Sequence, residues 1–143
     1  MLGDPIRKVM RKQKLLAGSP ATLVSEAAQR MRARNVGAIL VLEGDRLVGI
    51  CTERDIVFRV VAAGLAPDAT PIGDVMTPDP ITIDADKPFG AALAVMHREG
   101  FRHLPVVSNG KAIGVVSARS ALDPELEEFA SETQRRKHFD SLR

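Results

Sequence analysis

The stretch GICTERD at residues 49–55 is repeated in altered form as GVVSARS at residues 114–120. A shift of 65 residues, which sets Gly114 against Gly49, aligns 24–55 with 89–120 without a gap. Few of the aligned residues are identical, but apolar and polar positions follow the same order. The sequence therefore predicts two copies of one structural unit, the first ending in an aspartate and the second in a serine.

Each copy begins with a predicted helix that ends at a residue able to adopt left-handed backbone, Asn35 or Gly100. Two apolar runs around a turn follow, which predicts a β-hairpin, and then Thr52 or Ser117 stands where a helix N-cap belongs. The helices are predicted from apolar residues spaced i, i+3, i+4, i+7. These are Val24, Ala27, Ala28 and Met31 in the first copy, and Phe89, Ala92, Leu93 and Met96 in the second.

The short apolar run Ile81-Thr82-Ile83 predicts a strand ahead of the helix in the second copy. Each unit is thus predicted to have the order β-α-β-β-α, an α+β (α/β-like) arrangement. A unit of roughly 60 residues buries so little surface that its stability alone is marginal. We therefore expect the two repeats to pack face to face with pseudo-two-fold symmetry, which creates two related clefts between them. The predicted boundaries are 1–66 for the first repeat with an N-terminal segment, 67–122 for the second repeat and 123–143 for a helical tail.

The composition narrows the classes of function. Five Phe, no Trp and no Tyr leave few aromatic platforms for stacking nucleic-acid bases, and the net charge is only +2. A single cysteine excludes an internal disulfide, and no apolar run reaches the roughly 20 residues of a membrane helix. The three dispersed histidines lack the spacing of metal ligands. We expect a cytoplasmic protein without a metal site, and nucleic acid is not expected as its main partner.

Three motifs in this order resemble a tandem pair of CBS domains, the regulatory repeats named after cystathionine β-synthase and also called a Bateman module. They are GICTERD at 49–55, VMTPDPITI at 75–83 and FRHLPVV at 101–107. The resemblance covers about residues 6–122. It implies a stand-alone module that senses an adenine nucleotide in the clefts between repeats without transforming it. AMP is the first candidate, with ADP, ATP and NAD as alternatives.

The chemistry of the residues supports a main cleft around the first motif. A helix that begins at Thr52 directs backbone N–H groups and the positive end of its dipole at the cleft, which suits a phosphate. Asp55 offers two acceptor oxygens to the neighbouring hydroxyls of a ribose. The resemblance adds Thr77, Ile81 and Thr82 around the base, Arg102 and His103 with Arg54 toward the phosphates, and Phe101, Leu104 and Pro105 as an apolar wall.

A second cleft is predicted to be weak or empty. It combines Ser117, Arg119 and Ser120 with Leu15, Leu16, Gly37, Ala38 and Ile39. Ser120 replaces the ribose-binding aspartate, and Gly37-Ala38 replaces the pair Arg102-His103. A hydrogen bond to a charged acceptor contributes about 1.5–3 kcal/mol, or roughly ten- to a hundredfold in affinity.

Alternative interpretations remain for the first motif and for the chain as a whole. Thr52 and Asp55 have the spacing of a simple helix cap, and Cys51 is expected to be a small core residue. A pI near 9.0 and a basic tail leave room for a nucleic-acid-associated protein. A structural dimerisation module with vestigial clefts is a further alternative, whereas an enzyme acting on adenine nucleotides lacks a visible nucleophile or metal box.

The expected partners follow from the resemblance and the length. CBS pairs commonly dimerise, so a homodimer is expected. The repeats use nearly the whole chain, so the regulated effector is expected to be another protein. The tail has a broken amphipathic pattern formed by Leu126, Phe129, Thr133, Phe139 and Leu142. It is expected either to pack back on the module or to dock on a second subunit.

Overall fold

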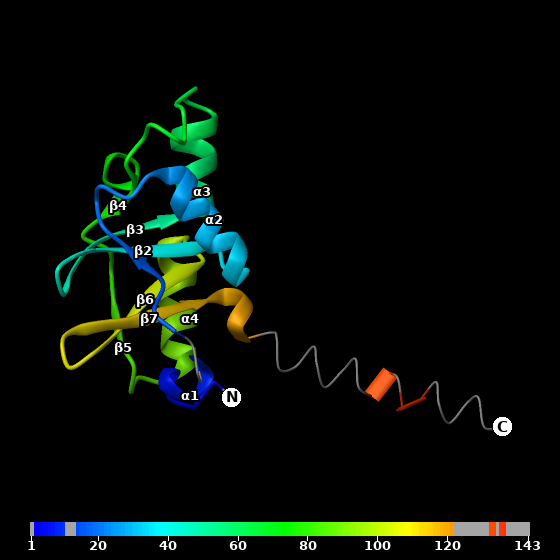
Figure 1. The fold of residues 1–143 in the computed structure, drawn as a ribbon. Coiled ribbons are helices and arrows are strands. Elements are labelled where there is room, and N and C mark those ends of the chain that lie inside the picture. The colour runs from blue at the N-terminus through cyan, green and yellow to red at the C-terminus, as the bar shows by residue number, and fades with distance from the viewer. Residues whose placement is uncertain (1, 11–13, 122–131, 134, 137–143) are drawn as a thin grey trace.

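The computed structural model describes residues 2–10, 14–121, 132–133 and 135–136. It contains two β-sheets, each made of a hairpin with one or two short flanking strands (Figure 1). The first sheet has the order β1 (Ala17–Gly18), β2 (Ala38–Glu43), β3 (Arg46–Thr52) and β4 (Thr77–Pro78). The second has the order β5 (Ile83–Asp84), β6 (His103–Ser108) and β7 (Lys111–Ser117).

The helices are short and lie around the sheets. They are α1 (Ile6–Met10), α2 (Val24–Arg34), α3 (Glu53–Ile56) with the π-helical turn η1 (Val57–Val61), and α4 (Phe89–Glu99). The chain also contains two 3-10 turns, η2 (Ile72–Asp74) and η3 (Ala118–Ala121).

The two copies match in backbone detail, which confirms the predicted repeat. Helix α2 ends at Asn35 with a φ of 52°, and α4 ends at Gly100 with a φ of 76°. In both sheets a short strand pairs in parallel with the first strand of an antiparallel hairpin. The hairpins even share an irregularity, because the register shifts between Val41 and Leu42 and again between Val106 and Val107. These pairs are equivalent under the shift of 65 residues.

The molecule has two halves, each built around one of the two sheets. The segment that precedes each repeat in the sequence packs on the half that contains the other repeat. Ile6 in α1 is fully buried in the core of the second half, and its backbone N–H donates to the carbonyl of Lys87 at 2.9 Å. Ile72 in η2 is fully buried in the core of the first half and donates to the carbonyl of Thr22 at 2.7 Å. Strand β4 then pairs with β3. The packing units therefore do not coincide with a division of the chain at residue 66.

The sheets meet through an apolar contact that holds the halves together. Ala38, Leu40 and Ile50 from the first sheet form one buried cluster with side chains of the second, including Ala112 and Val115. Helices α2 and α4 contribute to separate cores on either side of this contact. The face-to-face packing of two repeats is thus as predicted.

The helix after Thr52 and the tail complete the comparison with the predicted elements. The apolar residues of α3 and η1 do not all face the core: Val60 is fully buried, whereas Val57 is 50% and Val61 68% exposed. Of the tail 123–143, only residues 132, 133, 135 and 136 are described, so Leu126, Phe129, Phe139 and Leu142 lie outside the described residues. Among the described residues, no helix is long and apolar enough to cross a membrane.

Candidate functional site

Two cavities of similar size open where the halves meet. The main cavity, about 790 Å³, is lined by α3, η1 and the segments before β5 and β6. The second cavity, about 720 Å³, lies beside it between the end of α2 and η3. Such volumes are typical of sites for small organic ligands.

The main cavity gathers every predicted residue of its cleft except two. Thr82 is exposed outside the cavity, and Leu104 is fully buried in the core of the second half, because alternate residues of a strand face opposite sides of the sheet. The residues that line it are Thr52, Arg54, Asp55, Thr77, Ile81, Phe101, Arg102, His103 and Pro105.

Several lining residues were missed from the sequence. Phe58 and Arg59 stand three and four positions after Asp55, so helical periodicity already placed them on the same face. Arg59 links η1 to the segment between η2 and β4, because its guanidinium donates to the carbonyls of Val75 and Met76 at 3.2 and 3.0 Å. The others are Ile50, Glu53, Val57, Asp79, Pro80 and Gly100.

Asp55 is buried in the cavity wall, with only 7% of its surface exposed. One carboxylate oxygen accepts from the backbone N–H of Thr52 at 2.9 Å and from the Thr52 hydroxyl at 3.2 Å. The other accepts from the Thr77 hydroxyl at 3.3 Å. The guanidinium of Arg59 lies 3.8 Å away. Thr52 and Asp55 therefore form the capping box that the sequence left open as an alternative.

Ser120 occupies the matching place in the second half. The backbone N–H of Ser117 donates to the Ser120 hydroxyl at 3.3 Å, and the N–H of Ser120 donates back to the Ser117 hydroxyl at 3.2 Å. The serine thus keeps both reciprocal bonds of the cap but carries no negative charge. The exchange of aspartate for serine preserves the local backbone while changing the electrostatics.

The start of α3 offers fewer free amide groups than predicted. The N–H of Glu53 donates to the carbonyl of Gly37 at 2.9 Å, and the N–H of Asp55 donates to the Thr52 hydroxyl at 3.3 Å. The cationic side chains around the main cavity are therefore better placed to attract a phosphate than the helix start. One of them, Arg54, is 4.7 Å from the ring centroid of Phe58.

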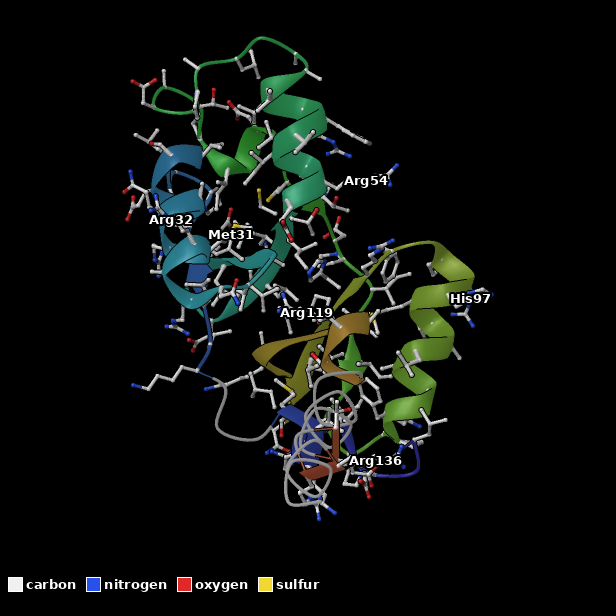
Figure 2. All side chains as sticks on the ribbon, turned by 90° about the vertical axis from the view of Figure 1, so that its right-hand side faces the viewer. Met31, Arg32, Arg54, His97, Arg119 and Arg136 are labelled. Atoms are coloured by element: carbon white, nitrogen blue, oxygen red, sulfur yellow. The ribbon has the colours of Figure 1, made fainter. Side chains whose placement is uncertain are left out.

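The second cavity is lined by Leu16, Gly37, Ala38, Ser117 and Arg119 of its predicted set. Leu15, Ile39 and Ser120 are not among its lining residues: Leu15 packs between the sheets, and Ile39 is fully buried in the core of the first half. Figure 2 shows Arg119 where the two halves of the molecule meet.

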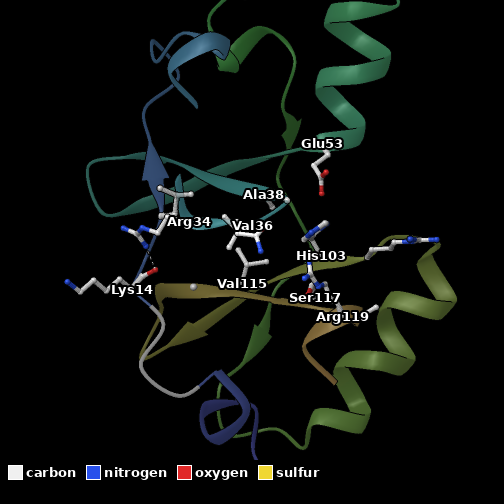
Figure 3. A pocket seen from close by; sticks show the side chains of 15 residues that line it. Lys14, Arg34, Val36, Ala38, Glu53, His103, Val115, Ser117 and Arg119 are labelled. Carbon is white, nitrogen blue, oxygen red and sulfur yellow. Dashed lines mark hydrogen bonds between the residues drawn. The ribbon is translucent and has the colours of Figure 1, made fainter. Parts of the chain in front are cut away.

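The two cavities differ less than the sequence suggests. Gly37 and Ala38 line the second cavity, where they are the equivalents of Arg102 and His103, but Arg102 and His103 themselves line the second cavity as well. Three residues, Glu53, Arg102 and His103, form a wall shared by the two cavities. Figure 3 shows Glu53 directed from the first half toward His103 on the second. The other lining residues that the sequence did not indicate are Lys14, Arg34, Asn35, Val36, Gly114, Val115 and Ala118.

His103 is half-buried in this shared wall, and its surroundings favour the neutral imidazole. Burial lowers its pKa from the usual 6.5, and the neighbouring Arg102 lowers it further, while Glu53 acts in the opposite direction. Buried Cys51, at the end of β3, has its pKa raised to about 12 by burial and by the charge of Asp55. Within the described residues, no group of three or more His, Cys, Asp or Glu side chains could hold a metal ion.

Comparisons with known proteins place these features in a family. The CBS domain family matches residues 6–62 and 72–124. CBS domain-containing protein CBSCBSPB2 of Arabidopsis thaliana is 40% identical over 121 residues, which cover 84% of this chain and 23% of that protein. The chain therefore spans about a quarter of that relative.

Two solved structures share the fold over most of their length. An uncharacterized conserved protein from Pyrococcus horikoshii is 32% identical with a TM-score of 0.78, covering 87% of this chain and 94% of that one. The CBS domain protein PAE2072 from Pyrobaculum aerophilum, which was solved in complex with AMP, is 26% identical with a TM-score of 0.72. That match covers 81% of this chain and 88% of the other.

Proposed function

Because this chain belongs to the CBS-domain family, as a tandem pair, we propose that it binds an adenine nucleotide in the main cavity and signals the bound state to another protein. The observation that carries the proposal is Asp55, a carboxylate fixed in the wall of a cavity of about 790 Å³ between the repeats. A buried carboxylate suits the paired hydroxyls of a ribose, and the AMP complex of a related fold supports the class of ligand.

The ribose can reach Asp55 only by competing with existing donors. Thr77 donates to the carboxylate across the cavity, from β4 to α3. A ribose hydroxyl would take over this acceptor, and the Thr77 hydroxyl would turn toward the base or solvent. Strand β4 lies on the segment that leads from the first half to the second. Replacing the Thr77 hydroxyl by a ribose hydroxyl would therefore couple ligand binding to the packing of the two halves.

The phosphate belongs at the other end of the cavity. Arg102 and His103 line the cavity from the second half, and Arg54 lines it from the first. A phosphate between them would bring cations of both halves to one anion. Bound nucleotide would therefore stabilise the contact between the repeats, and AMP is the first candidate because one phosphate is sufficient for this bridge.

The proposal includes regulation rather than catalysis and a homodimer rather than a monomer. Val57, Phe58 and Val61 are 50%, 57% and 68% exposed on α3 and η1, and a second copy of the chain would cover these apolar side chains. The effector is proposed to be a separate protein in the cytoplasm.

Calorimetric titration of AMP, ATP and NAD tests the proposal. We expect AMP to bind near one per chain and Asp55→Asn to weaken it about tenfold or more. Asparagine keeps an oxygen for the cap, so the helix start is retained. Asp68→Asn, at an exposed position outside the cavities, is the matched control. Equal affinity of both variants, or no heat with any nucleotide, would refute the proposed site.

A further inference from the structure

The shared wall between the cavities contains one acidic side chain, Glu53, whose backbone is held beside Gly37. The N–H of Glu53 donates to the carbonyl of Gly37 at 2.9 Å. A side chain at Gly37 would overlap the Glu53 carboxylate, and its Cβ would lie 2.9 Å from Nε2 of His103. The absence of a side chain at Gly37 therefore lets the carboxylate and the imidazole approach each other where the two cavities meet (Figure 3).

The negative charge of Glu53 is not neutralised by a direct contact. Among the described residues, none forms a hydrogen bond or an ion pair with its carboxylate. His103 supplies little positive charge near neutral pH, because burial and Arg102 favour its neutral form. The carboxylate thus places a negative charge at the passage between the main and second cavities, beside a second cavity that is otherwise lined by the cationic side chains of Lys14, Arg34, Arg102 and Arg119.

This charge bears on ligands of different length. In the proposed site, a nucleotide with its ribose at Asp55 has its first phosphate beside Arg102 and His103. A second and a third phosphate would continue past His103 toward the second cavity, because these two residues line both cavities. That route leads past the Glu53 carboxylate, where each added phosphate brings further negative charge.

We infer that Glu53 limits the number of phosphate groups that the main cavity accepts and so selects a nucleoside monophosphate over the corresponding triphosphate. The inference rests on the proposed function. Repulsion between like charges grows with the charge of the ligand, so Glu53 weakens the binding of AMP slightly and the binding of ATP more. Since the carboxylate is exposed to solvent, the effect is moderated by water and salt.

The test is calorimetric titration of AMP and of ATP in magnesium-free buffer with wild-type protein and three variants. Glu53→Gln removes the charge, Glu53→Lys reverses it, and Glu26→Gln removes a charge of the same kind from an exposed position on α2. We expect wild-type protein to prefer AMP. The ratio of the two affinities should move toward ATP by about 3–10-fold in Glu53→Gln, further in Glu53→Lys, and not in Glu26→Gln. Thermal unfolding of each variant shows whether it is folded.

The outcomes separate this inference from the proposed function. AMP binding with an unchanged AMP-to-ATP ratio in both Glu53 variants would overturn the role of Glu53 and leave the nucleotide site standing. Tighter binding of ATP than of AMP by wild-type protein would overturn it as well. Absence of binding by every nucleotide would overturn both, whereas a graded shift through the charges −1, 0 and +1 at this position would support both.

Discussion

Replacing Asp55 by alanine should lower the free energy of unfolding by about 2–4 kcal/mol. The carboxylate accepts three hydrogen bonds in a site that is 7% exposed, from the Thr52 N–H, the Thr52 hydroxyl and the Thr77 hydroxyl. Loss of a cap costs about 1 kcal/mol, and loss of a charged acceptor costs about 1–3 kcal/mol, with a value near the lower end expected here because Thr52 is half-buried and Thr77 is exposed. The pair with Arg59 adds little, because the arginine is half exposed and the atoms are 3.8 Å apart.

Replacing Asp55 by serine should cost clearly less, about 1–2 kcal/mol. The second half shows the reason: the Ser120 hydroxyl accepts from the Ser117 N–H at 3.3 Å, so a serine retains the cap. It is too short to keep the bond to Thr77. The difference between the alanine and serine variants therefore isolates the cap, and the remaining loss isolates the contact with β4.

Urea unfolding followed by circular dichroism at 222 nm measures these differences, at one fixed protein concentration because association would shift the midpoint. The matched control is Ser120→Ala, which removes the cap of the second half and should cost about 1 kcal/mol. Equal stability of Asp55→Ala and Asp55→Ser would refute the reasoning. So would a loss below about 0.5 kcal/mol in both, which is the range of ordinary surface substitutions.

Three further predictions concern His103, Cys51 and Gly37. Because the pKa of His103 is lowered in the folded protein, the unfolded chain binds more protons than the folded one below about pH 6.5. The urea concentration at the midpoint of unfolding should therefore fall as the pH is lowered from 7 to 5. His103→Asn should flatten this dependence, and His97→Asn is the control. A pKa of about 12 should make Cys51 react with a thiol reagent at pH 8 about a thousandfold more slowly than in urea-unfolded protein, and comparable rates would contradict its burial. Gly37→Ala should change the free energy of unfolding by less than about 1 kcal/mol in urea unfolding, because the added methyl group meets only the ends of the Glu53 and His103 side chains and the exposed Glu53 can move aside, and a larger loss would show that this wall is rigid.

The repeat and most of its elements were predictable because they depend on local patterns. Apolar spacing indicated α2 and α4, and the left-handed residues Asn35 and Gly100 indicated where they end. The exchange of α1 and β4 between the halves was not predicted, since it depends on pairings only two residues long between distant segments. Strand β4 contacts β3 only through Thr77 and Pro78, which leaves no periodic signal.

The site was predictable where a motif forms it and not where two halves share it. The motif around Asp55 identified the main cavity, and helical spacing would also have found Phe58 and Arg59. The sequence assigned Arg102 and His103 to one cleft because each motif was considered with a single partner. In the structure these side chains lie at the junction of both cavities, a position that depends on how the two sheets pack.

The exchanged segments interlock the two halves, so that the core of each half contains a residue from the other repeat. A protease cut near Gly64, in the connection between the repeats, would give an amino-terminal fragment carrying Ile6 and a carboxyl-terminal fragment carrying Ile72. Each fragment would hold an isoleucine that is fully buried in the core of the other. The two fragments of the cut chain should therefore stay associated and unfold in one transition, although the sequence consists of two copies of one unit.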